Sequence, residues 1–140
     1  MSEQPDIVLL AMTVNAEGGE RLRLDPADSG LLAGPVAIKE GAQYSLGLEF
    51  RVNHGDTAGV RYIQVVKRAG VTVDKLEEGL GVYGPSSDGS LYKKELAAEE
   101  APTGLQARSG TYKVRSRIVG DDGTVYADFE WSYKLAKDWQ

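Results

Sequence analysis

The chain of 140 residues contains no cysteine. This absence excludes disulfide bonds and thiolate metal ligands, so folding does not depend on an oxidising compartment. Long hydrophobic runs are also missing. The apolar stretch from Ile7 to Val14 is too short to cross a bilayer, and no basic segment precedes it, so it is neither a membrane span nor a signal peptide. We therefore expect a cytoplasmic protein without stable membrane insertion, in which Ile7 to Val14 forms a first strand.

Positive charge is scarce relative to negative charge. The chain has 16 lysines and arginines against 21 aspartates and glutamates, which gives a net charge of −5. Binding of nucleic acid as a main role needs a basic surface, so the composition argues against it and favours a basic partner segment instead. The length is that of one domain with one core, and we expect a single domain over residues 1–140, with its folded body at about 7–139.

Helical periodicity is also absent over any long segment, whereas strand alternation is strong. In the stretch TVYADFEWSYKLAKDW, Val125, Ala127, Phe129, Trp131, Tyr133 and Leu135 share one parity. The stretches QYSLGLEFRV and GTYKVRSRI alternate in the same way, and turn signals such as EGGE, NHGD and DDG separate the runs. This spacing predicts an all-β, immunoglobulin-like antiparallel β-sandwich. A turn of helix is expected only in KELAAEE, before Pro102. The aromatic face of the last strand could fill a core or wall a cavity.

Catalytic groupings are nearly absent. The single histidine, His54, lies in NHGDT, where asparagine, glycine and aspartate predict a turn rather than a His54–Asp56 dyad. The DDG stretch likewise predicts a hairpin turn, and it supplies too few oxygen ligands for calcium. No glycine-rich phosphate loop is present, because GLGVYGP lacks the required lysine. We therefore predict no catalytic residue, no metal site and no cofactor, and a binding protein rather than an enzyme.

Several segments together carry a family resemblance: FRVNHGDTAGVRYIQVVKRAGVTVDK, GVYGP, EEAPTGLQAR, TYKVRSRI, DDGT and FEWSYKLAKDW. In this order, from about Ile7 to Trp139, they resemble the Rho GDP-dissociation inhibitor (RhoGDI) family. The resemblance implies a sandwich whose sheets accept the geranylgeranyl tail of a Rho-type small GTPase. Carried over by position, it implies a prenyl slot lined by Val14, Val36, Leu105, Val114, Phe129 and Trp131. It also implies that Asp74, Asp121 and Asp122 face the basic C-terminal region of the GTPase.

The chain departs from the family pattern at a few positions. Phe129 stands where the family favours a second tryptophan, Gln106 lies beside a position that is usually aliphatic, and Glu78 replaces a tyrosine. Six residues precede the first expected strand, whereas the family carries a long N-terminal arm that folds on the GTPase switch regions. We therefore expect a solubilising chaperone with weak extraction from membranes and weak or no inhibition of nucleotide exchange. Two alternatives remain open: an interaction module with a filled core, and a carrier of another lipid.

Overall fold

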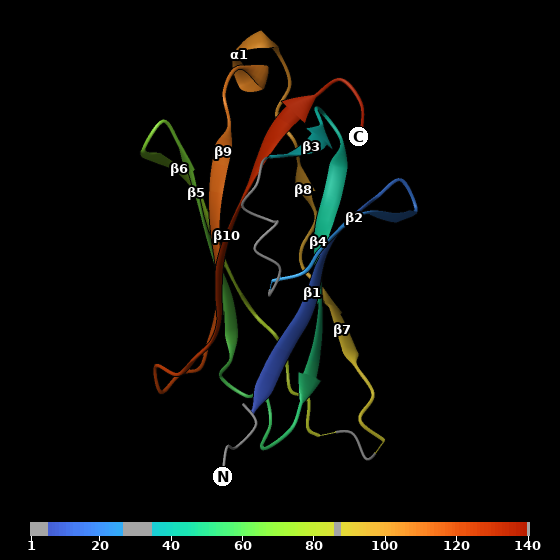
Figure 1. Cartoon of the computed structure of the whole chain (residues 1–140), viewed down its shortest axis with the longest axis vertical. Helices are drawn as coiled ribbons and strands as arrows, with labels where there is room; N and C mark the ends of the chain where they lie inside the picture. Colours follow the sequence, from blue (N-terminus) through green and yellow to red (C-terminus); the bar gives the residue numbers. More distant parts are fainter. Residues whose placement is uncertain (1–5, 27–34, 86–87, 140) are drawn as a thin grey trace.

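The computed structural model describes residues 6–26, 35–85 and 88–139, and they form two β-sheets packed face to face (Figure 1). The first sheet has the order β2-β1-β4-β7, with β8 also pairing with β4, and consists of β1 (Ile7–Ala16), β2 (Gly19–Leu24), β4 (Gln43–Val52), β7 (Tyr92–Glu95) and β8 (Glu99–Glu100). The second has the order β3-β10-β9-β5-β6 and consists of β3 (Val36–Lys39), β5 (Arg61–Arg68), β6 (Val71–Gly79), β9 (Tyr112–Val119) and β10 (Val125–Ala136). The predicted immunoglobulin-like β-sandwich is confirmed.

Alternation along the strands builds the core between the two sheets. Leu46, Leu48 and Phe50 of β4 are buried on the inner face of the first sheet, and Trp131 and Leu135 of β10 are buried on the inner face of the second. Burying one such side chain completely contributes about 1.5–3 kcal/mol relative to leaving it exposed. The inner faces of these strands therefore supply the main driving force for folding. Strands β3 and β10 run parallel, whereas the other described pairs are antiparallel.

Two local expectations are wrong. The register between β9 and β10 shifts between Val125 and Ala127, and Val125 is 54% exposed, so it does not share the inner face with Phe129. The stretch KELAAEE is not helical: Glu99 and Glu100 form β8 against β4, and the helix α1 (Leu105–Arg108) follows Pro102 instead. The residue before a proline is biased towards extended backbone, which favours a strand over a helix at this point.

The lower end of the sandwich in Figure 1 holds the N-terminal end of β1, the C-terminal end of β4 and the β9–β10 turn. The ring of Phe50 lies 5.4 Å from that of Tyr83 and 5.8 Å from that of Tyr92. Beside them, the Thr57 hydroxyl donates to the Gly81 carbonyl at 2.6 Å and accepts the Tyr83 amide N–H at 2.8 Å. The upper end holds α1, the β5–β6 hairpin and the end of β10. Across the described ranges, no helix has the length and hydrophobicity that a bilayer crossing requires.

Candidate functional site

Stacked aromatic rings line the inner face of β10 and β9. Trp131 is 4% exposed and lies opposite Val114 in the β9–β10 ladder. Its ring is 5.7 Å from that of Tyr133, which stacks on Tyr112 at 4.9 Å with an angle of 9° between the ring planes. Because this layer faces β1 and β4 across the sandwich, it forms one wall of the space between the sheets.

A chain of buried hydrogen bonds fixes the Trp131 ring. The indole N–H donates to Ser116 Oγ at 3.0 Å, and Ser116 Oγ lies 2.8 Å from Tyr62 Oη. The Tyr62 hydroxyl donates to Gln64 Oε1 at 2.6 Å, so the proton between Tyr62 and Ser116 must come from the serine. Burial raises the pKa of Tyr62, so the phenol stays protonated and keeps its donor role. Each hydrogen bond is therefore donated in the same direction, from Trp131 to Ser116, from Ser116 to Tyr62 and from Tyr62 to Gln64.

The sequence predicted Trp131 but missed its three polar partners. Tyr62, Gln64 and Ser116 are at most 4% exposed and lie on the inward parity of β5 and β9. The signal was present, because a glutamine and a serine at inward positions of two apolar strands are uncommon and require buried partners. The structure therefore adds Tyr62, Gln64 and Ser116 to the candidate site.

Most residues predicted to line the prenyl slot face the space between the sheets. Val14 and Val114 are buried, and Val36 and Phe129 are partly buried against the same core as Trp131. Leu105 is different: it lies on α1 with 78% of its surface exposed. The structure brings five of these residues into one interior layer from β1, β3, β9 and β10, and it places Leu105 outside that layer.

Acidic side chains border the aromatic layer where β6 and β8 approach each other. Tyr44 of β4 hydrogen-bonds to Glu99 of β8, and Asp74 and Glu78 of β6 lie within electrostatic reach of Glu99. Burial raises the pKa of Glu99, and the Asp74 and Glu78 carboxylates add to this rise, which the Tyr44 hydroxyl partly offsets. Asp74 also lies close enough to Tyr133 to contribute, after burial, to raising the pKa of that phenol. Glu78 already has partners, because its carboxylate accepts the Ala97 amide N–H at 3.0 Å and lies 3.9 Å from Lys94 Nζ. Of Asp74, Glu78 and Glu99, which we call the edge acids, Asp74 and Glu99 can therefore receive a further cation beside the interior.

The two other predicted acids lie at the opposite end of the sandwich. Asp74 is level with Val114, because both pair with Val66, whereas Asp121 and Asp122 follow the end of β9. Asp121 and Asp122 are seven and eight residues beyond Val114, most of the intervening residues lie in β9, and this separation corresponds to roughly 20 Å. The structure therefore divides the predicted acidic site into two. The predicted hairpin turn is confirmed, since the Asp122 carboxylate accepts the Thr124 amide N–H at 2.9 Å.

Asp121 lines a surface hollow at this lower end. The hollow has a volume of about 560 Å³ and is bounded by the loops before β5 and after β6, with Gly59, Arg61 and Val82 in its wall. Val82 is 73% exposed, and the buried Nε of Arg61 has no hydrogen-bond partner among the described residues. A concave surface with an acid, an exposed aliphatic group and an unsatisfied donor is suited to a protein segment.

The expectations of no catalytic residue and no metal site stay predictions. His54 is exposed in the bend between β4 and β5. Because these two strands lie in different sheets, the predicted turn is a loop that crosses between the sheets rather than a hairpin. Within residues 6–26, 35–85 and 88–139, no three histidine, cysteine or acidic side chains are grouped so that they could hold a metal ion. The Asp56 carboxylate accepts the Ala58 amide N–H at 3.0 Å, which stabilises the same loop.

Comparison with known proteins gives a consistent set of matches. A family described as "RHO protein GDP dissociation inhibitor" matches residues 1–138. The chain is 33% identical to "Rho GDP-dissociation inhibitor" of Schizosaccharomyces pombe, over 99% of the chain and 68% of that protein. It is 34% identical to the human "Rho GDP-dissociation inhibitor 1", over 97% of the chain and 67% of that protein. With "Probable rho GDP-dissociation inhibitor" of Caenorhabditis elegans it shares 41% identity, over 74% of the chain and 52% of that protein.

Proposed function

Because the chain belongs to the Rho GDP-dissociation inhibitor family, we propose that it binds a Rho-type small GTPase and shelters its prenylated C-terminus between the two sheets. The protein then acts as a regulatory binding protein and a solubilising chaperone, not as an enzyme. The observation that carries this proposal is the interior layer of Val14, Val114, Phe129 and Trp131, contributed by both sheets.

The chemistry of this layer suits an isoprenoid chain. Aromatic and aliphatic side chains offer dispersion contacts to branched hydrocarbon along its whole length. Phe129 of β10 and Val36 of β3 are both only partly buried, and both belong to the second sheet. A hydrocarbon that enters between the two sheets would cover both side chains and would be removed from water at about 0.8 kcal/mol per methylene.

The edge acids support the polar half of the proposal. Basic residues often precede a prenylated cysteine, and a cation entering beside the aromatic layer would meet Asp74 and Glu99. Asp121 and the hollow beside it would contact a different part of the GTPase, because roughly 20 Å of strand separates the two acidic sites. One acidic site thus serves the lipidated tail and the other serves the folded domain.

Fluorescence titration tests the lipid part directly. Trp131 is the reporter, and a Trp139→Phe variant removes the second tryptophan from the signal. A geranylgeranylated, carboxyl-methylated C-terminal peptide is added in one series, and the same peptide without lipid in a matched series. We expect a saturable change in Trp131 emission only with the lipidated peptide. Absence of a response to either peptide would refute the lipid slot and favour an interaction module. A stronger response to a fatty acyl peptide would assign the slot to another lipid.

The expectation of weak or no inhibition of nucleotide exchange stays a prediction. It is measured by the release of a fluorescent GDP analogue from a prenylated Rho-type GTPase in the presence of the purified 140-residue chain. We expect the release rate to change by less than about twofold at a concentration that saturates the lipid titration. Complete inhibition at that concentration would refute it.

A further inference from the structure

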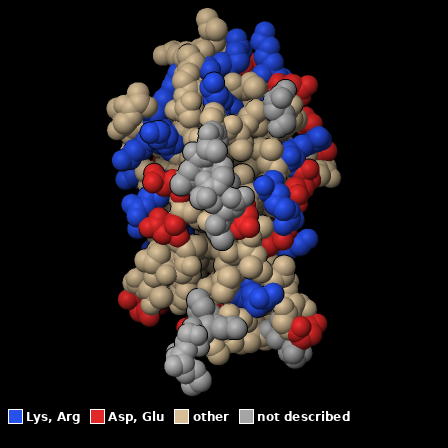
Figure 2. Space-filling model, viewed as in Figure 1, with Lys and Arg blue, Asp and Glu red and all other residues tan. Residues whose placement is uncertain are grey.

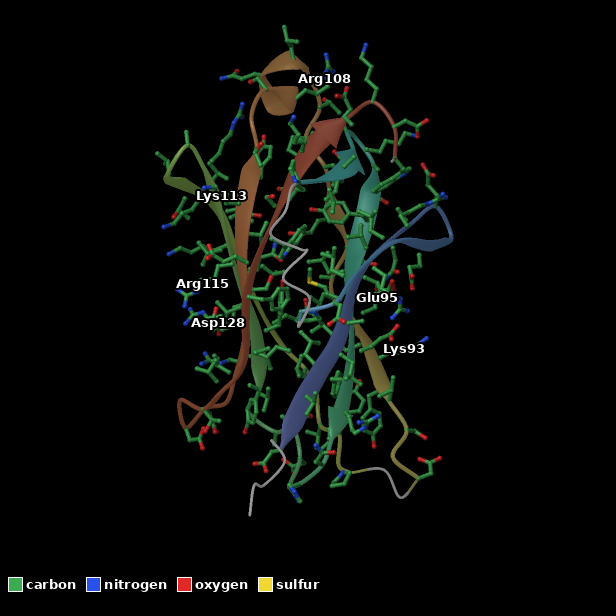
Figure 3. The ribbon with its side chains drawn as sticks, in the orientation of Figure 1. Lys93, Glu95, Arg108, Lys113, Arg115 and Asp128 are labelled. Atoms are coloured by element: carbon green, nitrogen blue, oxygen red, sulfur yellow. The ribbon has the colours of Figure 1, made fainter. Side chains whose placement is uncertain are left out.

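The outer face of the second sheet collects positive charge that the net charge of −5 conceals. Six cations from β5, β6, β9 and β10 point away from the first sheet: Lys67, Lys75, Lys113, Arg115, Arg117 and Lys134. We call this surface the basic face. Figure 3 shows Lys113 and Arg115 projecting outward from β9, and in Figure 2 lysine and arginine atoms gather along this side of the upper half.

The charges of the basic face are only partly neutralised. Arg115 forms two hydrogen bonds with Asp128, at 3.0 and 2.7 Å. The ammonium groups of Lys67, Lys75, Lys113 and Lys134 form no ion pair with any carboxylate of the described residues. Lys67 and Lys113 are opposite each other across the β5–β9 ladder, where like charges destabilise a sheet. This pair of like charges therefore does not stabilise the sheet, and the unpaired ammonium groups are available to an anion.

Exposed aliphatic side chains lie at the tip of the β5–β6 hairpin, at the upper edge of the second sheet. Val71 and Val73 of the β5–β6 hairpin are 64% and 51% exposed, and they adjoin Thr72, the ladder partner of Lys67. Val71 pairs with Arg68 on the inward parity of β5, so it lies beside the basic face rather than on it. Arg68 ties this hairpin to the α1 segment by donating hydrogen bonds to the backbone carbonyls of Gln106 and Ser109. The tie keeps the two upper loops together beside the lysines.

We propose that the basic face docks on the surface of an anionic lipid bilayer, with the lysines against lipid phosphates and carboxylates and the hairpin valines in the headgroup region. A sheet face that carries four lysines without ion pairs is complementary in charge to the anions of such a bilayer surface. The exposed valines favour a bilayer over a soluble polyanion as the ligand, because only a bilayer has an apolar layer beneath its charged headgroups. The docking is peripheral, and it requires neither a GTPase nor an occupied slot.

Vesicle sedimentation of the purified chain alone tests this inference. Vesicles of phosphatidylcholine are compared with vesicles that contain about a third phosphatidylserine, at roughly 0.1 M salt. We expect sedimentation with the anionic vesicles only, and its loss as salt is raised. The Lys67→Glu/Lys113→Glu variant should lower the partition coefficient at least about tenfold. The matched variant Arg51→Glu/Lys93→Glu changes the net charge equally on the outer face of the first sheet, and it should alter the coefficient by less than about twofold.

Two further variants separate the outcomes. Lys67→Glu alone places opposite charges across the ladder, so it should stay folded by circular dichroism and still bind less well. Val71→Ser/Val73→Ser keeps every charge and should reduce binding about threefold, because it removes the apolar contribution. Equal losses in the two charge-reversed pairs, equal binding to neutral vesicles, or no sedimentation at all would each overturn the inference. Because the assay contains no GTPase and no prenylated peptide, its result is independent of the proposed function.

Discussion

Replacing Ser116 with alanine tests whether the buried hydrogen-bonded chain holds Trp131 in place. The substitution removes the acceptor of the indole N–H at 3.0 Å and the hydroxyl partner of Tyr62 at 2.8 Å. It changes the side-chain volume little. A buried donor without a partner costs about 1–3 kcal/mol, whereas Tyr62 keeps Gln64 as its acceptor and adds little to that cost. We therefore expect a loss of about 1–3 kcal/mol in the free energy of unfolding.

Thermal and urea unfolding measure this loss. For a domain of this size, about 1 kcal/mol corresponds to a shift of roughly 3–5 °C in Tm, so the variant should melt roughly 3–15 °C lower. Ser132→Ala is the matched control, because Ser132 lies on the outer side of β10 opposite Lys113 and should change stability by less than about 0.5 kcal/mol. In a Trp139→Phe background, the freed indole should also show a red-shifted emission and a weaker response to lipidated peptide.

A double-mutant cycle isolates the chain from simple loss of packing. Tyr62→Phe and Ser116→Ala each break the same hydrogen bond, so the double variant should lose less stability than the two single variants together. Groups in one hydrogen-bonded network couple by about 0.5–3 kcal/mol. Strict additivity, or a Ser116→Ala loss no larger than that of Ser132→Ala, would refute the view that this chain positions Trp131.

Three more predictions address the slot and its acids. Val114→Trp should abolish binding of a labelled lipidated peptide with only a modest loss of stability if a slot exists, whereas overpacking of a filled core should cost about 1–3 kcal/mol; equilibrium unfolding and peptide anisotropy distinguish the two. Because burial raises the pKa of Glu99, its contribution to stability is present at acidic pH and is lost as pH rises through the raised pKa. Glu99→Gln should therefore raise Tm at neutral pH and make the difference from the wild type vanish on acidification; an unchanged difference across pH would contradict this. Asp74→Asn should weaken peptide binding and its salt dependence, whereas Asp121→Asn should affect binding of the folded GTPase but not of the peptide; equal effects on the peptide would contradict the division into two acidic sites.

Local alternation predicted the aromatic wall of the site because a strand has only two faces. Phe129 and Trp131 could be assigned to the inner face of β10 from parity alone, and Val114 to the inner face of β9. Parity failed at Val125, since a bulge between Val125 and Ala127 changes the side-chain direction and depends on the partner strand rather than on the local sequence.

The polar part of the site depends on pairing between distant segments. The bond between Ser116 and Tyr62 links residues 54 positions apart, and it requires the register of β5 on β9. The approach of Glu99 to Asp74 requires β8 to pair with β4 and β6 to lie at the edge of the second sheet. No periodicity within one strand contains that information. Asp74, Asp121 and Asp122 could be named as acidic site residues, but their separation followed only from the position of each strand.

On the proposed function, the energetics of lipid transfer make the charged surfaces more important than the slot for the direction of transfer. Moving a prenyl chain from a bilayer to an apolar slot exchanges one hydrocarbon environment for another, so the gain of about 0.8 kcal/mol per methylene nearly cancels. The direction of transfer must then be set by contacts outside the lipid. On the proposed function, the edge acids and Asp121 favour the protein-bound state through the basic tail and the folded GTPase. The basic face would act earlier, by holding the protein at an anionic membrane where the tail is available. Raising ionic strength should consequently slow delivery at the membrane and weaken capture in the slot, since both steps rest on charge.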